Sequence, residues 1–224
     1  HVRSRRQRQM CIRDRLQSAF DHFNSSPSRV IILSSTGKVF SAGHDLKELK
    51  AARSHPDKGK EYFQSILKKC SRLMQTIVNH SKPVIAQVDG VATAAGCQLA
   101  LSCDLVYASS NSRFATPGVN IGLFCSTPMV ALSRNTTSKH SMEMLLTGEL
   151  ISADDAEKKG LINKSVNEEE LENLILEKAT KISSKSATTL KIGKKAFYQQ
   201  IEMPLAEAYD LSLIHISEPT RRTP

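Results

Sequence analysis

Short apolar runs alternate with longer amphipathic segments along this chain. Three of the runs are rich in β-branched residues and have the length of buried strands: residues 30–33, 83–88 and 105–108. The first of them is expected to be buried on both sides. A short segment, Arg113–Ala115, is a fourth candidate strand. Strands that alternate with helices predict an α/β fold with mostly parallel pairing.

Segments with apolar positions at helical spacing predict the helices. They are residues 16–23, 46–52, 58–78, 95–101, 129–132, 141–146, 168–183 and 186–200. Residues 152–155 resemble a capping box and start a further helix that stops at Gly160. Residues 161–162 are expected to form a brief strand or an extended link. Because helices crowd the second half, we expect a sheet-containing core followed by a helical section.

The two ends of the chain differ in character from the middle. Residues 5–15 (RRQRQMCIRDR) and 211–221 (LSLIHISEPTR) resemble translated sequencing-adapter DNA. We therefore expect residues 1–15 and 211–224 to be non-native ends and residues 16–210 to form a single domain. The alternative for the first end is a genuine basic arm.

The charge of the chain lies mostly in these ends. The whole chain carries a net charge of +9, whereas residues 16–210 hold 23 basic and 20 acidic side chains, a net charge of +3. Nucleic-acid binding therefore loses its main support. The main basic cluster, residues 191–195, is expected to be a solvated helix face, and RNA binding stays a distant third hypothesis.

The cysteines show neither a C-x-x-C pair nor a spacing typical of a disulfide framework. We expect reduced, intracellular thiols at positions 70, 97, 103 and 125, while Cys11 falls in the N-terminal end. No apolar run approaches the roughly 18 residues that a membrane span needs.

Two turns rich in glycine and alanine stand out, at residues 41–46 and 92–99. Each follows an apolar run and opens into a segment with helical spacing, so its backbone N–H groups lack helical acceptors. Either turn alone is a tight strand-to-helix connection. Two of them brought together can hold one developing negative oxygen, which suggests an enzyme or a former enzyme that binds a carbonyl compound.

Several ordered motifs resemble the enoyl-CoA hydratase/isomerase (crotonase) superfamily over residues 16–210. They are FSAGHDLK at 40–47, PVIA at 83–86 followed by Asp89-Gly90, AAGCQLA at 94–100, FATP at 114–117 and LTGELISA at 146–153. The resemblance implies an α/β crotonase (ClpP-like) fold with repeated ββα units, two sheets and a C-terminal helical section. It also implies a homotrimer or hexamer that acts on acyl-CoA in fatty-acid and lipid metabolism. The motifs are similar to those of a mitochondrial member, which implies a mitochondrial location.

By this resemblance, the chain lacks segments at both ends of the family's domain. We therefore expect the chain as written to fold poorly or to associate.

The resemblance places an oxyanion hole on the backbone N–H groups of His44 and Ala95. No metal is implied, and CoA enters only as part of the substrate. The His44 imidazole is expected to be a rim group rather than a general base. Lys47 either faces the CoA adenine or phosphates, or is a solvated surface lysine. The positions implied to contact the substrate are Ala42, Gly43, Lys47, Ala94, Gly96, Gly118 and Cys125.

The chain departs from the family pattern at the two glutamates that activate water in the hydratases. Their positions fall on Gln98 and Gly118. Glutamine cannot exchange a proton and glycine has no side chain, so ordinary hydration is expected to be very weak, since each such group typically contributes ~10²–10⁴-fold. Gln98 either orients a water or substrate group, or packs its amide within the helix. The alternatives are an acyl-CoA protein whose chemistry is lost or replaced, and a non-catalytic acyl-CoA-binding or assembly protein.

Other candidates have bland explanations. Asp104 is expected to be a structural carboxylate, Asp45 a helix cap, and Cys97 a small buried hydrophobe. Glu143 and His140 are expected to form a surface pair. Cys125, Ser126 and Thr127 lie in a loop where relatives place chemistry-specific side chains.

Overall fold

The computed structural model describes the backbone of residues 5–217 and the side chains of residues 12–213. Residues 1–4 and 218–224, which belong to the two expected non-native ends, lie outside this range, and so does the side chain of Cys11. The helices are α1 (Arg5–Phe23), α2 (Leu46–Ala52), α3 (Lys60–Val78), α4 (Ala95–Leu101), α5 (Ser126–Leu132), α6 (Ser138–Thr147), α7 (Ala153–Lys158), α8 (Glu168–Ser183), α9 (Ala187–Gln200), α10 (Leu205–Ser217) and the 3-10 helix η1 (Pro117–Ile121). The strands are β1 (Ile31–Leu33), β2 (Val39–Ser41), β3 (Val84–Val88), β4 (Val91–Thr93), β5 (Leu105–Ser109), β6 (Arg113–Ala115), β7 (Ile151–Ser152) and β8 (Lys164–Val166).

The strands form two four-stranded sheets, in the orders β1-β3-β5-β8 and β2-β4-β6-β7. Strands β1 to β6 alternate between the two sheets, whereas β7 joins β6 in the second sheet and β8 returns to the first. Helical segments follow the pairs β1–β2, β3–β4 and β5–β6. All strand pairs are parallel except β6 with β7. The expected repeated ββα units, two sheets and mostly parallel pairing are confirmed.

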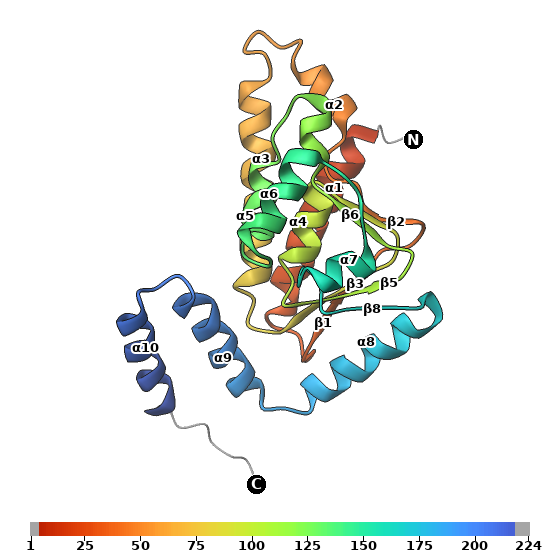
Figure 1. The fold of residues 1–224 in the computed structure, drawn as a ribbon. Coiled ribbons are helices and arrows are strands. Elements are labelled where there is room, and N and C mark those ends of the chain that lie inside the picture. The colour runs from red at the N-terminus through yellow and green to blue at the C-terminus, as the bar shows by residue number, and fades with distance from the viewer. Residues whose placement is uncertain (1–4, 218–224) are drawn as a thin grey trace.

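The first sheet is covered on both faces, which explains its apolar runs. Alternate residues of a strand point to opposite faces. On one face of β3, Val84, Ala86 and Val88 enter the main core, while Ile85 packs with Leu171 of α8 on the other face. The other helices up to α7 lie on the main-core side, and α10 extends away from this body (Figure 1). α9 contacts the body through Lys194 and Tyr198, which both bond to Asp104.

One expectation about the strands is wrong. Residues 30–33 are not buried on both sides, because β1 is an edge strand and Ile32 is 38% exposed. Of the two alternatives for residues 161–162, the strand is not formed: these residues form a buried turn that links α7 to β8, which starts at Lys164. This turn is held by Asn163, whose N–H donates to the Val106 carbonyl while its side-chain oxygen accepts from the Val106 N–H, at 2.8 and 2.7 Å.

None of the helices that the structure describes is long and apolar enough to cross a lipid bilayer.

Candidate functional site

The two glycine-containing turns lie against each other. β2 and β4 are parallel neighbours in the second sheet, with Ser41 opposite Ala92, so both strands end at the same edge. A Cβ placed on Gly96 would lie only 1.9 Å from the backbone oxygen of Ser41. A Cβ on Gly43, where φ is +83°, would lie 3.0 Å from the backbone nitrogen of Ala95. The absence of side chains at these two positions therefore lets the turns touch.

The second turn has an unusual backbone conformation. Ala94 has φ 51° and ψ −121°, a region that costs a non-glycine residue of order 1–3 kcal/mol. Its N–H donates to the Ala115 carbonyl of β6 at 2.9 Å, and its carbonyl accepts from Gln98 N–H at 3.0 Å. These bonds fix the turn and start α4 at Ala95. The N–H of Ala95, in the first turn of this helix, has no acceptor within the helix.

The first turn leads directly into α2. Asp45 is the N-cap, as expected, and its side chain accepts from the Lys47 N–H at 2.8 Å. The His44 side chain is half-buried, and no hydrogen-bond partner for its buried Nε2 is found among the described residues. Desolvation, and secondarily the positive charge of Arg13, lowers the pKa of His44 to about 4. The imidazole is therefore neutral at neutral pH.

Gln98, on α4, is one of the two positions where the sequence resemblance implies a hydratase glutamate. It is 5% exposed, and its Oε1 accepts from the Cys70 thiol of α3 at 3.8 Å. Burial raises the pKa of the Cys70 thiol, so this donor stays protonated. The amide is thus connected to α3 rather than turned to solvent.

Gly118, where the sequence resemblance implies the other glutamate, is buried at the start of η1. Its N–H donates to the Cys125 thiol at 3.3 Å. A Cβ on Gly118 would lie 2.9 Å from Cys125 Sγ and 2.8 Å from the Leu123 carbonyl oxygen. The space that a side chain would need is therefore filled. Burial raises the pKa of the Cys125 thiol, which remains neutral.

The sequence analysis overlooked a buried carboxylate in α2. Glu48 is 6% exposed, and its Oε2 accepts from the Tyr62 hydroxyl of α3 at 2.8 Å. The other oxygen, Oε1, is buried and has no hydrogen-bond partner among the described residues. No local signal reveals this burial, because Glu48 is a first-turn glutamate of α2, three residues after the Asp45 cap.

Asp104 is the structural carboxylate that was expected. It accepts from the Val84 N–H, Lys194 Nζ and the Tyr198 hydroxyl, at 2.7, 2.7 and 2.9 Å. The Lys194 side chain is 9% exposed, so the expectation of a solvated face at residues 191–195 is wrong at this lysine. Desolvation lowers the pKa of Lys194, although Asp104 opposes the shift.

The remaining candidates lie apart from the turns or add little chemistry. Glu143 forms an exposed ion pair with Lys159 at 2.8 Å, and within the described range no three His, Cys, Asp or Glu side chains group as metal ligands. Cys97 is fully buried, which raises the pKa of its thiol to about 12. Ala42, Lys47 and Ser126 are exposed and Thr127 is half-buried.

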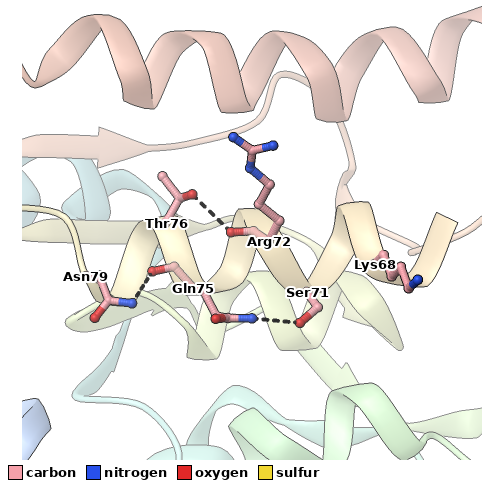
Figure 2. A pocket seen from close by; sticks show the side chains of 6 residues that line it. All are labelled: Lys68, Ser71, Arg72, Gln75, Thr76 and Asn79. Carbon is pink, nitrogen blue, oxygen red and sulfur yellow. Dashed lines mark hydrogen bonds between the residues drawn. The ribbon is translucent and has the colours of Figure 1, made fainter. Parts of the chain in front are cut away.

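A polar hollow lies elsewhere, along α3 (Figure 2). Its side chains already have partners: Gln75 donates to Ser71 at 3.0 Å, and Thr76 bonds to the Arg72 carbonyl and to Gln17 of α1. None of the candidate site residues lines it.

Comparison with known proteins adds independent information. A family model described as enoyl-CoA hydratase/isomerase matches residues 9–222. The rat protein named enoyl-CoA hydratase domain-containing protein 3, mitochondrial, is 50% identical over 188 residues, which are 84% of this chain and 61% of the relative. The chain thus spans less than two thirds of this relative.

Solved structures agree with this match. The crystal structure of human enoyl Coenzyme A hydratase domain-containing protein 3 has a TM-score of 0.86 and 47% identity, and covers 92% of this chain and 80% of that one. The structure of an enoyl-CoA hydratase from Mycobacterium smegmatis has a TM-score of 0.86 and 43% identity, with coverages of 91% and 78%.

Proposed function

The chain belongs to the enoyl-CoA hydratase/isomerase family, and we propose that it binds acyl-CoA thioesters through an oxyanion hole. In this proposal, the backbone N–H groups of His44 and Ala95 hold the thioester carbonyl oxygen. The observation that carries it is the contact between the two turns, in which the absence of a side chain at Gly43 and Gly96 lets both backbones meet.

The physical advantage of such a site is preorganisation. Donors fixed by the fold pay no reorganisation cost when negative charge develops on the carbonyl oxygen, and one such donor contributes about 3 kcal/mol in other enzymes. Because the donors are backbone groups, the side chains of His44 and Ala95 do not decide their strength. The strained Ala94 turn is consistent with this role, since such strain clusters at functional sites.

Around this hole, the proposal assigns simple roles to neighbouring residues. Ala42, Gly43, Ala94 and Gly96 form the backbone walls of the two turns. Lys47 is exposed two residues after the Asp45 cap, where its ammonium group can meet the CoA phosphates. The buried pair of Gly118 and Cys125 then forms part of the wall where hydratases carry a carboxylate.

Ordinary hydration is proposed to be lost or replaced. Neither Gln98 nor Gly118 can exchange a proton, and Cys125 fills the space beside Gly118. A non-catalytic acyl-CoA-binding or assembly protein is the alternative, and it predicts thioester affinity without turnover across a broad panel. By similarity to relatives that are named mitochondrial, we propose a mitochondrial location. The family resemblance further leads us to propose a role in lipid metabolism and a homotrimer or hexamer.

Calorimetric binding of octanoyl-CoA, free CoA and octanoate to the 224-residue chain tests the proposal. We expect the thioester to bind more tightly than either part alone, and His44→Ala, which keeps the backbone donor, to retain this selectivity. Equal affinity for free CoA and octanoyl-CoA, or no binding of all three, contradicts the proposal.

A further inference from the structure

The carboxylate of Glu48 is an unusual feature that the proposed oxyanion hole does not use. Its Oε1 is buried without a partner among the described residues, although the side chain is only 6% exposed. A buried polar atom without a partner typically costs ~1–3 kcal/mol, and more when it is charged. Such a group needs either a donor that arrives with a ligand or a structural reason.

The common structural reason does not apply here. Glu48 is the third residue of α2 after the Asp45 cap, the position at which a capping-box glutamate accepts from the backbone N–H of the cap residue. Here the carboxylate reaches sideways instead, and Oε2 accepts from the Tyr62 hydroxyl at 2.8 Å. Tyr62 of α3 therefore fixes Oε2, while Oε1 has no hydrogen-bond donor among the described residues.

The place of Glu48 in the chain relates it to the proposed oxyanion hole. Glu48 lies in the first turn of α2, three residues after the Asp45 cap. Helical side chains lean toward the helix N-terminus, which here adjoins the turn at residues 41–46. The buried Nε2 of His44 has no partner among the described residues either. Two buried polar atoms without partners among the described residues therefore lie close together in the sequence: Nε2 of His44 in the first turn, and Oε1 of Glu48 at the start of the helix that follows it.

Helix α3 links this corner to the second turn. Tyr62, Ile66 and Cys70 are four residues apart and share one face of the helix. Tyr62 bonds to Glu48 of α2, and Cys70 bonds to Gln98 of α4. α2 and the first turns of α3 stand next to each other at the top of Figure 1. This stripe, roughly 12 Å long, therefore connects Glu48 of α2 to Gln98 of α4 through a hydrogen bond at each end.

We propose that Glu48 determines specificity by accepting a hydrogen bond from a hydroxyl group on the acyl chain, beyond the carbons next to the thioester. The inference rests on the proposed function, because the ligand enters as an acyl-CoA. A hydroxylated chain satisfies Oε1 with a hydrogen bond, whereas a plain alkyl chain leaves this buried oxygen without a donor. Tyr62 is a positioning residue that fixes the carboxylate through its other oxygen.

The test compares matched pairs of CoA thioesters in which a hydroxyl replaces a terminal methyl group. Those of 4-hydroxybutyrate, 5-hydroxypentanoate and 6-hydroxyhexanoate are measured by calorimetry against pentanoyl-, hexanoyl- and heptanoyl-CoA. We expect at least one hydroxylated thioester to bind about tenfold or more tightly than its alkyl partner. Glu48→Leu should abolish the preference, while Glu61→Gln, an exposed control on α3, should keep it.

The outcomes separate this inference from the proposed function. Equal affinity within every pair, or a preference that survives Glu48→Leu, overturns the role of Glu48 while thioester binding itself stands. No binding of any thioester removes the proposed function and this inference with it. If the leucine variant unfolds, Glu48→Gln keeps the shape without the charge and should reduce the preference several-fold, whereas an unchanged preference overturns the inference.

Discussion

The backbone oxygen of Ser41 occupies the space that a side chain on Gly96 would need, only 1.9 Å from the position of its Cβ. Ser41 ends β2 and Gly96 is the second residue of α4, so this contact joins the two halves of the candidate site. Backbone meets backbone here, and no rotation of a side chain can relieve an added methyl group. The oxyanion hole that we propose depends on this close approach.

Gly96→Ala is therefore expected to separate the turns. Overpacking of this kind typically costs ~1–3 kcal/mol, and we expect the upper part of that range because the obstacle is backbone. Gly193→Ala is the matched control, since a Cβ there meets nothing within 4 Å on α9, and it should be neutral or slightly stabilising. Urea denaturation gives both values, and equal midpoints for the two variants would refute the packing argument.

Restoring a glutamate at position 118 should not restore hydration. The side chain in Gly118→Glu meets Cys125 Sγ and the Leu123 carbonyl oxygen, so we expect a loss of roughly 1–3 kcal/mol and no gain in enoyl-CoA hydration. Cys125→Ala removes one of the two obstacles, so the double variant should be more stable than the sum of the single effects predicts. A denaturation cycle over the four proteins measures this coupling, and strict additivity would mean that the thiol does not occupy this space.

The ion pair between Lys194 and Asp104 is expected to hold α9 on the body. No residue in the described helix α9 is fully buried, so its docking relies on the polar contacts of Lys194 and Tyr198. Lys194→Met leaves Asp104 without its cation, at a cost of about 3 kcal/mol for a buried pair. Lys195→Met, at an exposed neighbour, should have little effect. Amide hydrogen exchange should speed up over residues 187–200 in the first variant alone, and unchanged exchange there would argue against this anchor.

His44 should make stability depend on pH in the acidic range. Its pKa is about 4 in the folded chain and 6.5 for a free imidazole side chain, so between these values the unfolded chain binds more protons. The contribution of His44 to the free energy of unfolding is complete above pH 6.5 and is lost as the pH falls to about 4. The difference between the chain and His44→Gln isolates this term from His80. NMR titration of the imidazole checks the pKa directly, and a value near 6.5 would contradict the burial argument.

The sequence predicted most long elements because their periodicity is strong. The stripe on α3 and the apolar run of β3 each show the spacing of the element that forms. The strands β7 and β8 have only two and three residues, too few to show a period, and depend on their partners. β1 was misjudged because an apolar run does not tell a central strand from an edge strand.

At the candidate site, too, local patterns could be recognised in the sequence, whereas contacts between distant residues could not. The two turns are local patterns, so the sequence located both, and the structure places them in contact. Burial of Lys194 depends on Asp104, 90 residues earlier, and no local signal reveals such a partner. Glu48 resembled an ordinary first-turn glutamate, and only its contact with Tyr62 shows that its carboxylate is turned away from the helix cap.

Infrared spectroscopy of the bound thioester tests the central claim most directly. The chain is loaded with octanoyl-CoA carrying ¹³C at the carbonyl, and a second protein replaces Ala95 by lactic acid, which removes one N–H and keeps the methyl side chain. We predict that binding shifts the carbonyl stretch to lower frequency and that the Ala95 ester variant loses a large part of this shift. A bound carbonyl with the frequency of free octanoyl-CoA, or one unaffected by the ester, would contradict the account.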